Sequence, residues 1–536
     1  MIYSKVWKEL ANNTFLFLLI GNIAFFSLAV YFLPIRFEEN DDVIMLLFAS
    51  GKYTGTPEAH LVFINYIYGL FISFLYSVTT KIEWYTLLFA VIHVLSLSLV
   101  ISSIICKNIK PAYKVLFIVL FYTIELRLIL QFQFTTTAAL AALGGITLIL
   151  KEKKQQYILG IILLIISSLI RFEAALLVIL MASPAFISYS YKNRQFYLSQ
   201  KLISIMIAVT LIMFCKYIDH HIYQNNSSWA YYSKYNKMRG QINDNPNANY
   251  IKNSLPSGIS SLDYQLLLNF MPDPKIINIE HVSLLQDKIG HIDLKQKIKN
   301  IYPALRSYTT FLLLIIALWT IIYLCSNTRL KKNILLFSLL LFLSLLCFIA
   351  LDGTLKYRVF LASLMPFLFV LFFNLEPIKR PLIRTFAYGI GILFFIIFSY
   401  RICKIQKQKN YSFYSSFIEQ KNVLDKYLNN KNNYIVALPN NFNIENYSPF
   451  SVSSSFFCKQ IFFSGWLTGI PYNEGLYDSY LDVINKNAIF CSKQNLITFI
   501  PLITRAIKNN YKINVYPKIE IQSDHYVILR FCKESY

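Results

Sequence analysis

The stretch "RFEENDDVIMLLFASGKYTGTPEAHLVF", residues 36–63, directly follows the first long apolar run of the chain, at about 13–34. That run is long enough to cross a bilayer. The stretch contains a cluster of four carboxylates, Glu38, Glu39, Asp41 and Asp42. Acidic residues often flank a membrane helix without further function. A carboxylate in this place can also act as a general base, or hold a divalent cation against a phosphate.

The composition predicts a membrane protein with many spans. Of the 536 residues, 56% are hydrophobic, 16% are aromatic and only 15% are charged, which is too apolar for a soluble multidomain protein. The net charge of +23 does not indicate nucleic acid, because the Lys and Arg residues fall in short clusters between apolar runs. The positive-inside bias of membrane proteins accounts for such clusters. We therefore expect a lipid bilayer and no nucleic acid as partner.

Twelve apolar runs are candidate membrane helices. They lie at about 13–34, 62–79, 84–106, 114–127, 131–150, 156–171, 173–190, 202–218, 308–325, 333–350, 358–375 and 384–400. If all of them crossed the membrane, the N-terminus and the basic loop at 107–114 would lie on opposite faces. If instead the run from His60 to Val78 lies in the outer interface, eleven crossings remain, and the six basic segments all face the cytoplasm.

This topology places the N-terminus in the cytoplasm and the two long polar segments, at about 219–307 and 401–536, on the extracytoplasmic face. We expect an α-helical polytopic domain over 1–403, with outer loops 35–83 and 219–307. Short alternating runs such as "NNYIVAL" and "HYVILRF" predict a small α/β domain over 404–536. Its cysteines, Cys458, Cys491 and Cys532, lie where a disulfide can form but cannot be inferred.

Charged residues at the outer ends of the predicted helices gather on the same face. They are Asp41, Asp42, Glu125, Arg127, Arg171, Glu173, Asp352, Lys356 and Arg358. Ionisable groups at membrane depth are costly, so they usually pair with one another or face a polar cavity. Pairing of Glu125 with Arg127, or of Arg171 with Glu173, is the structural alternative. Because three separate helix ends supply Arg127, Arg171, Lys356 and Arg358, we expect them to clamp a phosphate whose lipid tail stays in the bilayer.

The sequence gives weaker indications of function for the remaining candidate site residues. His60 opens the interfacial segment, where a histidine more often caps or packs than catalyses. Arg239 and Asp263 lie in the outer loop 219–307 and are candidate acceptor contacts. The "DHH" at 219–221 could ligate a metal, but the sequence shows no second ligand motif, so no metal site is predicted.

The first outer loop, "ENDDVIMLLFASGKYTGTPEAHLVFINYIYGLFISFLY" at 39–76, resembles that of the membrane glycosyltransferases of the GT-C superfold. This group contains the protein O-mannosyltransferases, the aminoarabinose transferase of lipid A and the oligosaccharyltransferase. Its first outer loop holds an acidic motif and interfacial helices. The segments "LIRFEA", "YNKMRG" and "LDGTLKYRVFLASLMP" are similar to uncharacterised bacterial members.

The resemblance implies transfer of a hexosyl or pentosyl unit from a polyprenyl-phosphate donor to a cell-surface glycan or a lipid-linked acceptor, outside the bacterial plasma membrane. Asp41 or Asp42 would take the proton of the acceptor hydroxyl, usually with inversion at the anomeric carbon. Adjacent residues on a helix point about 100° apart, so only one of the two is expected to face the site. Members of the superfold differ in whether they need a divalent cation such as Mg²⁺ or Mn²⁺, and the sequence leaves this open.

Two other functions remain as alternatives. A polysaccharide polymerase also uses outer-face arginines and polyprenyl-linked glycans, but such proteins tend to carry their large outer loop late in the chain. A transporter of lipid-linked glycans would have a similar charged cavity, but transporters often show repeat symmetry between their halves, and this sequence shows none. The transferase is therefore the preferred interpretation.

Overall fold

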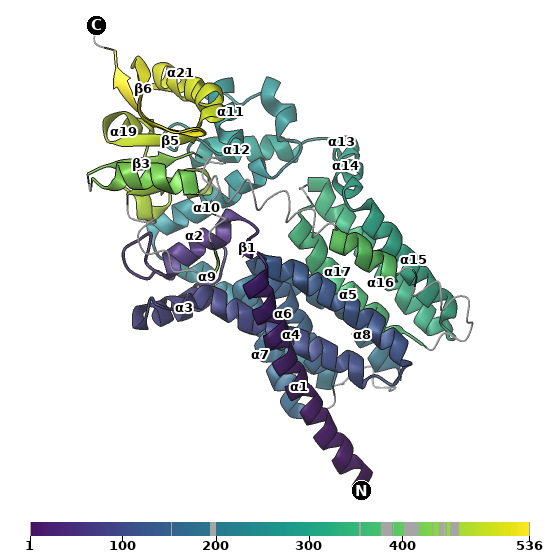
Figure 1. Cartoon of the computed structure of the whole chain (residues 1–536). Coiled ribbons are helices and arrows are strands. Elements are labelled where there is room, and N and C mark those ends of the chain that lie inside the picture. Colours follow the sequence, from purple (N-terminus) through teal and green to yellow (C-terminus); the bar gives the residue numbers. More distant parts are fainter. Residues whose placement is uncertain are drawn as a thin grey trace.

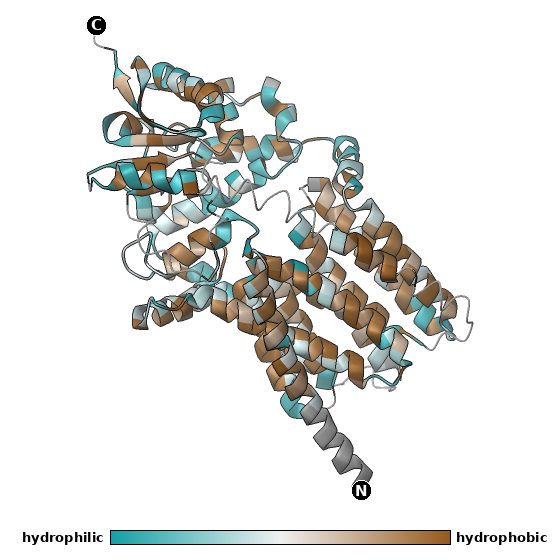
Figure 2. Cartoon of the chain, viewed as in Figure 1, coloured by the Kyte–Doolittle hydropathy of each residue, from teal (hydrophilic) through white to brown (hydrophobic). Residues whose placement is uncertain are grey.

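A computed structural model gives the architecture of the chain. It describes residues 2–534 apart from 152, 193–199, 353–354, 377–388, 390, 401–417, 431, 439–443, 445–447 and 451–459. A bundle of long helices carries a smaller α/β unit at one end, and the N-terminus lies at the other end (Figure 1). The bundle is largely hydrophobic, and polar residues concentrate towards the end that carries the sheet (Figure 2). This is the helical membrane architecture, with a C-terminal α/β domain, that the sequence predicts.

The predicted apolar runs form helices throughout the described part of the bundle. Their bounds are α1 (Ile2–Phe32), α4 (Trp84–Cys106), α5 (Pro111–Leu130), α6 (Phe134–Ile149), α7 (Lys154–Ile170), α8 (Phe172–Lys192), α9 (Gln200–Gln224), α15 (Thr309–Cys325), α16 (Arg329–Asp352) and α17 (Tyr357–Asn374). Among the described residues, six helices are long and apolar enough to cross a membrane, or seven if one bent pair counts as a single span. The predicted total of eleven crossings stays a prediction, since α6 and α7 have only 16 and 17 residues.

Helix α6 is the centre of the bundle and is buried along its whole length. Its small residues allow this, because they let neighbouring backbones approach closely. A Cβ atom added at Gly145 would lie 2.7 Å from the carbonyl oxygen of Gly160 on α7. The close packing of α6 against α7 holds α6 in place within the bundle.

The first outer loop contains two helices, α2 (Asn40–Ala49) and α3 (Tyr66–Val78). A short parallel pairing between β1 (Arg36–Phe37) and β2 (Gln131–Phe132) places the start of α2 beside the start of α6. Helix α3 projects sideways from the bundle (Figure 1), and Leu70, Phe71 and Phe74 are exposed on it. An apolar exposed face suits the membrane interface where this segment was predicted to lie. The helix begins at Tyr66 rather than His60, because the Asn65 side chain accepts from the Ile67 N–H and caps it.

The second outer loop is mostly helical. It contains α10 (Ser227–Asn243), the 3₁₀ helix η1 (Ala248–Asn253), α11 (Ser261–Leu268), α12 (Ile279–Gly290), α13 (Leu294–Lys299) and α14 (Ile301–Arg306). Its buried apolar residues form a separate small core between α10, α11 and α12. The loop is therefore a folded unit rather than a connection.

The C-terminal unit is built on a five-stranded mixed sheet. Its strands are β3 (Tyr434–Ala437), β4 (Ile461–Phe463), β5 (Asn487–Ser492), β6 (Val515–Gln522) and β7 (Tyr526–Lys533), in the order β4-β3-β5-β7-β6. Strand β3 pairs parallel with β4 and β5, and β7 runs antiparallel to β5 and β6. Helices α19 (Tyr480–Asn485), α20 (Lys493–Thr498) and α21 (Ile500–Tyr511) connect the strands. The predicted boundary at 403/404 lies outside the described residues.

The C-terminal unit rests directly on the first outer loop. The Tyr53 hydroxyl donates to Asn473 Oδ1 at 2.8 Å, and the rings of Phe48 and Tyr472 lie 4.8 Å apart. Residues of α2, of the C-terminal sheet and of the bundle share one apolar core. Helix α2 is thus enclosed between the bundle and the C-terminal unit, whereas α3 is not.

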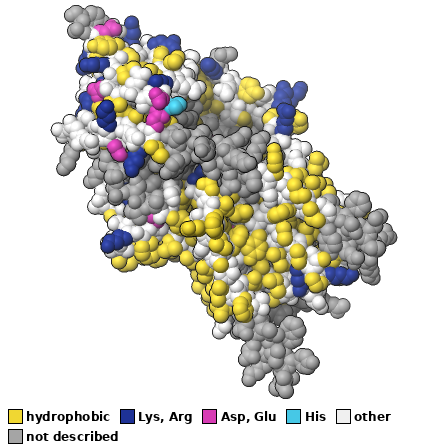
Figure 3. Space-filling model, viewed as in Figure 1, with side chains coloured by type: hydrophobic (Ala, Val, Ile, Leu, Met, Phe, Trp, Pro, Cys, Tyr) yellow, Lys and Arg dark blue, Asp and Glu magenta, His cyan; other side chains and the backbone are white. Residues whose placement is uncertain are grey.

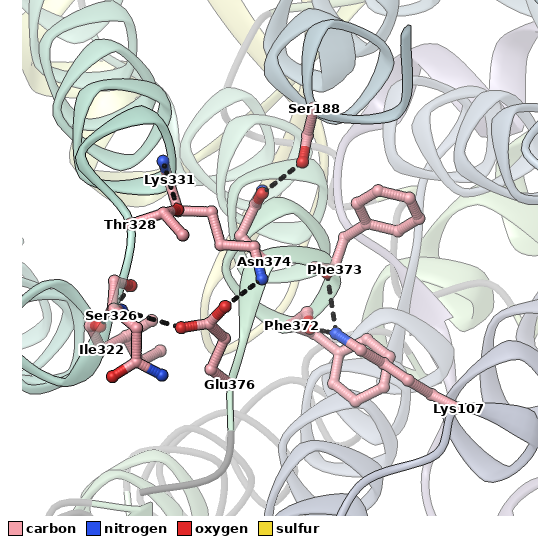
Figure 4. A network of polar contacts seen from close by, with 11 residues as sticks. Lys107, Ser188, Ile322, Ser326, Thr328, Lys331, Phe372, Phe373, Asn374 and Glu376 are labelled. Carbon is pink, nitrogen blue, oxygen red and sulfur yellow. Dashed lines mark hydrogen bonds and ion pairs between the residues drawn. The ribbon is translucent and has the colours of Figure 1, made fainter. Parts of the chain in front are cut away.

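A polar network closes the opposite end of the bundle (Figure 4). Lys107 donates to the carbonyl oxygens of Phe372 and Phe373, which are among the last carbonyls of α17, and Lys331 pairs with Glu376. Ser188 of α8 donates to Asn374 Oδ1 at 2.8 Å. Cations suit the C-terminal end of a helix. This network joins the end of α17 to α8, to the end of α4 and to the start of α16, far from the C-terminal sheet.

Candidate active site

Asp42 is fully buried and ties α2 to the bundle. Its Oδ1 accepts from the Tyr85 hydroxyl of α4 at 2.9 Å and from the Phe134 backbone N–H, at the start of α6, at 3.0 Å. No described group lies within hydrogen-bond distance of its Oδ2. Burial raises the pKa of Asp42 well above its usual value, against the opposing effect of the Tyr85 hydrogen bond. The contacts of this carboxyl group are those of a structural residue.

Asp41, one residue earlier, lines a cavity of about 690 Å³. Burial raises the pKa of Asp41, and the negative charge of Glu39 adds to this effect. Arg358, Lys356 and Arg171 oppose it. The acidic pair is therefore divided: Asp42 holds the helix in place, and Asp41 faces the cavity.

Five parts of the chain form the walls of the Asp41 cavity. They are the first outer loop, helix α10, the C-terminal sheet, the starts of α6, α8 and α17, and the end of α16. The space-filling view shows the hydrophobic surface of the bundle and the charged side chains towards the C-terminal end (Figure 3). The cavity combines both kinds of residue, because apolar side chains of α8, α16 and α17 and charged side chains of the first outer loop and of α10 line it.

Three of the four predicted phosphate ligands line this cavity, and each has a carboxylate partner. Arg358 Nη1 lies 2.7 Å from Glu39 Oε1, Lys356 Nζ lies 3.1 Å from Asp244 Oδ1, and Arg171 Nε lies 2.9 Å from Glu173 Oε2. The Arg171 guanidinium also lies over the Phe134 ring, 5.4 Å from its centroid. The predicted pairing of Arg171 with Glu173 is present.

Arg127, the fourth predicted phosphate ligand, does not line the Asp41 cavity. It is buried with its guanidinium 5.1 Å from the centroid of the Tyr357 ring, and its Nε has no acceptor among the described residues. Glu125 pairs with His93 Nδ1 at 2.7 Å rather than with Arg127. The sequence could not indicate this pair, because His93 lies in the middle of a different apolar run.

Arg239 of α10 also lines the cavity, and it is buried. Its Nη2 donates to Asn236 Oδ1 at 2.7 Å and its Nη1 to Asn243 Oδ1 at 3.2 Å. Its Nε has no acceptor in the part of the chain that the structure describes. Buried guanidinium groups normally use more of their donors. Arg239 therefore joins Arg171, Lys356 and Arg358 around Asp41.

Trp466 is a cavity residue that sequence reasoning missed. It is buried, lines the cavity, and lies with its ring centroid 4.8 Å from that of Phe63 of the first outer loop. Its carbonyl oxygen accepts from the Tyr232 hydroxyl of α10 at 2.7 Å. The preceding Gly465 has a φ of 88°, which favours glycine. The segment "FSGWLTG" contained a usable signal, a tryptophan between two glycines in an outer domain.

The other candidates do not line the Asp41 cavity or lack a described side chain. The His60 ring stacks on Trp229 with centroids 4.6 Å apart, which is a packing contact. Asp263 accepts from the Asn510 side-chain amide at 2.9 Å and joins α11 to α21. The Asp352 side chain is outside the described residues. Within the described residues, no group of three or more His, Cys, Asp and Glu is arranged to hold a metal ion.

Comparison with known proteins adds one likeness in overall fold. No protein-family model matches the chain, and no curated protein is similar to it in sequence. Its structure is similar to one described as "Crystal Structure of ArnT from Cupriavidus metallidurans in the apo state", with a TM-score of 0.48 and 10% identity over 95% of this chain and 98% of that one. A likeness at this level says nothing about substrate or catalytic residues, so the function is inferred from the site.

Proposed function

We propose that this chain is a membrane glycosyltransferase of a bacterial plasma membrane, which moves a sugar from a polyprenyl-phosphate donor to an acceptor on the extracytoplasmic face. The observation that supports it is the Asp41 cavity: one carboxylate faces the same space as Arg171, Arg239, Lys356 and Arg358. A base next to a group of cations is what glycosyl transfer from a lipid phosphate requires. On this proposal the N-terminus is cytoplasmic and the C-terminal unit is outside.

In the proposed reaction, Asp41 acts as the general base. Its carboxylate takes the proton from the acceptor hydroxyl while that oxygen forms a bond to the anomeric carbon of the donor sugar. The bond from the anomeric carbon to the phosphate oxygen breaks, and its electron pair leaves with the phosphate. Attack from the face opposite the phosphate inverts the anomeric configuration. A raised pKa makes Asp41 a stronger proton acceptor than an exposed aspartate.

The cations stabilise the leaving group. Negative charge grows on the phosphate as the bond breaks, and guanidinium and ammonium groups that are already in position lower the barrier without reorganising. Arg358 and Lys356, at the start of α17, and Arg171, directly before α8, line the cavity at the ends of apolar helices. They are therefore the proposed phosphate ligands.

The apolar residues of the cavity suit the lipid part of the donor. They come from α8, α16 and α17, and include Leu177, Ile349, Val359 and Ala362. A polyprenyl chain gains free energy only where it leaves water. A path between these helices would let the tail stay in the bilayer while its phosphate reaches Arg358.

The deciding experiment compares Asp41→Asn with Asp42→Asn in the full-length protein. Glycans and lipid-linked sugars would be measured by mass spectrometry in cells lacking the protein, complemented at matched membrane levels. We expect Asp41→Asn to reduce transfer at least about 100-fold, since a general base typically contributes 10²–10⁴-fold. Asp42→Asn keeps most activity, because an amide oxygen can still accept from Tyr85 and from the Phe134 N–H.

The comparison of the two variants can support or exclude a catalytic role for Asp41. Loss of one sugar from the surface glycan, with build-up of its polyprenyl-phosphate donor in the Asp41→Asn strain, supports the transferase and names the sugar. Full complementation by Asp41→Asn would exclude a catalytic role for this carboxylate. Equal loss in both variants would contradict the division of roles between Asp41 and Asp42.

A further inference from the structure

A second and larger cavity opens beside the Asp41 cavity. Its volume is about 1290 Å³, and it is formed mainly by α9, α10, α12 and the segment before α3. The two cavities share six lining residues: Phe63, Arg171, Glu173, Asn236, Gly240 and Asp244. They are therefore neighbours across a thin wall, and a molecule in the larger cavity lies next to the proposed reacting centre.

Most acidic groups of the larger cavity are already neutralised by cations. Lys216 Nζ lies 3.1 Å from Asp219 Oδ2, and the shared carboxylates Glu173 and Asp244 pair with Arg171 and Lys356. Of the acidic residues that line the cavity, Asp287 is the remaining one.

Several basic side chains line the same cavity as Asp287. Lys234 and Lys237 lie one turn apart on α10, are exposed, and have no acidic partner among the described residues. His220 and His291 line the same space. The charge of three of the four carboxylates is balanced by a paired cation, whereas Lys234 and Lys237 have no such partner in the described part of the chain, so the cavity as a whole favours a negatively charged ligand.

The cavity is large and polar. Pockets that bury a drug-sized ligand usually measure about 300–1,000 Å³, so this one has room for more than a small metabolite. Besides the charged groups, its lining includes Asn65, Ser233, Gln241, Asn245 and Gln286, together with the rings of Tyr223 and Tyr232. Amide and hydroxyl groups beside aromatic rings suit a sugar chain, which offers many hydroxyl groups and apolar ring faces.

We propose that the larger cavity binds the acceptor, and that this acceptor is an anionic, water-soluble glycan carrying phosphate or carboxylate groups. This inference rests on the proposed function, because it takes Asp41 as the base that the acceptor hydroxyl must reach. Lys234 and Lys237 contact the anionic groups, and the chain passes the shared residues Asn236 and Gly240 towards Asp41. The lipid donor occupies the smaller cavity, so the two substrates approach from different sides.

The test is a binding measurement with the full-length protein in lipid nanodiscs. Three probes of equal length separate the possible ligand charges: hexagalacturonate carries carboxylates, a phosphorylated mannohexaose carries phosphates, and maltohexaose is neutral. We expect at least one anionic probe to bind about tenfold more tightly than maltohexaose, with an affinity that falls as salt is added. Which anionic probe binds identifies the charged group.

Lys234→Gln/Lys237→Gln should weaken binding of the anionic probe about three- to tenfold, because each charge contact at an exposed site is small. The matched control is Lys252→Gln/Lys275→Gln, which removes two exposed lysines that do not line the cavity. Equal binding of neutral and anionic probes, or no difference between the two double variants, would overturn the proposal. Asp41→Asn should bind the probe normally, so failure of the proposed chemistry and failure of this acceptor site are distinguishable.

Discussion

Asp41 and Asp42 are neighbours in the chain, but their carboxyl groups lie in different surroundings. Asp42 accepts from a tyrosine of α4 and from the backbone of α6, whereas Asp41 faces a cavity with Arg171, Lys356 and Arg358. A turn of about 100° between successive helix residues is enough to separate the two roles. The sequence predicts that only one of them faces the site, but choosing between them needs the positions of α4 and α6.

The charge of Arg358 should set the pH at which Asp41 works. Burial raises the pKa of Asp41, and Arg358 is the largest of the opposing effects. Replacing Arg358 with Gln removes that opposition, so the pKa of Asp41 rises further. Because the base acts in its deprotonated form, activity is lost as pH falls through this pKa, and the acid limb of the pH profile moves to higher pH.

The measurement is the pH dependence of transfer in nanodiscs for wild type and Arg358→Gln. We also expect the rate at the optimum to fall on the order of 100-fold, as for the loss of one donor to a developing negative charge. Arg306→Gln, an exposed change on α14, serves as the control and should leave both the limb and the rate unaltered. An acid limb that stays in place, or moves to lower pH, would show that Asp41 is not the titrating base.

At the scale of secondary structure, α2 is held by contacts at its start rather than by its own length. It has ten residues, which is short for an isolated helix. The β1–β2 pairing and the two hydrogen bonds of Asp42 join it to α4 and α6. These contacts keep Asp41 in the cavity.

Replacing Tyr85 with Phe should loosen α2 without removing any group that reacts. The change deletes one buried donor to Asp42, and a hydrogen bond of this kind contributes about 0.5–1.5 kcal/mol. We expect faster thermal inactivation in detergent and a decrease in transfer of only severalfold. Tyr250→Phe, at an exposed tyrosine of η1, is the control. A loss as deep as that of Asp41→Asn would instead indicate that Tyr85 takes part in the chemistry.

Elements that depend on local pattern could be predicted, and contacts between distant segments could not. The apolar runs that became α4, α8, α16 and α17 carry their own signal of length and hydropathy, and the alternating runs near the C-terminus indicated strands. The contribution of Trp466 to the cavity depends on how β4 and its loop meet Phe63, hundreds of residues earlier. The pairing of Glu125 with His93 depends on the packing of α4 against α5.

At the scale of the whole molecule, the second outer loop and the C-terminal unit form one body above the bundle. Tyr480 donates its hydroxyl to the Met271 carbonyl oxygen at 2.5 Å, and Asp263 and Asn510 join α11 to α21. Both parts supply walls of the Asp41 cavity, through Arg239 and Trp466 respectively. The interface between the second outer loop and the C-terminal unit, which we call the joint, should therefore influence sugar transfer although it lies outside the cavity.

Asp273 is the central residue of this joint. It is buried, and its Oδ2 accepts from the Tyr511 hydroxyl at 2.7 Å and from the Tyr480 N–H at 3.2 Å, while Oδ1 accepts from the Lys275 N–H at 3.1 Å. In Asp273→Ala the Tyr511 hydroxyl, the Tyr480 N–H and the Lys275 N–H all lose this acceptor. Leaving a buried donor unsatisfied costs about 1–3 kcal/mol.

We therefore expect Asp273→Ala to separate the C-terminal unit from the second outer loop more often than in the wild type. Limited proteolysis should cleave the C-terminal unit roughly tenfold faster, since about 1.4 kcal/mol corresponds to a factor of ten in the open population. Transfer should decrease in parallel, because opening moves Trp466 away from Phe63 and Arg239. Asp293→Ala, at an exposed aspartate before α13, should change neither. If cleavage accelerates while transfer stays at the wild-type level, the C-terminal wall of the cavity is not needed for catalysis, and the site is complete with the bundle and the first outer loop alone.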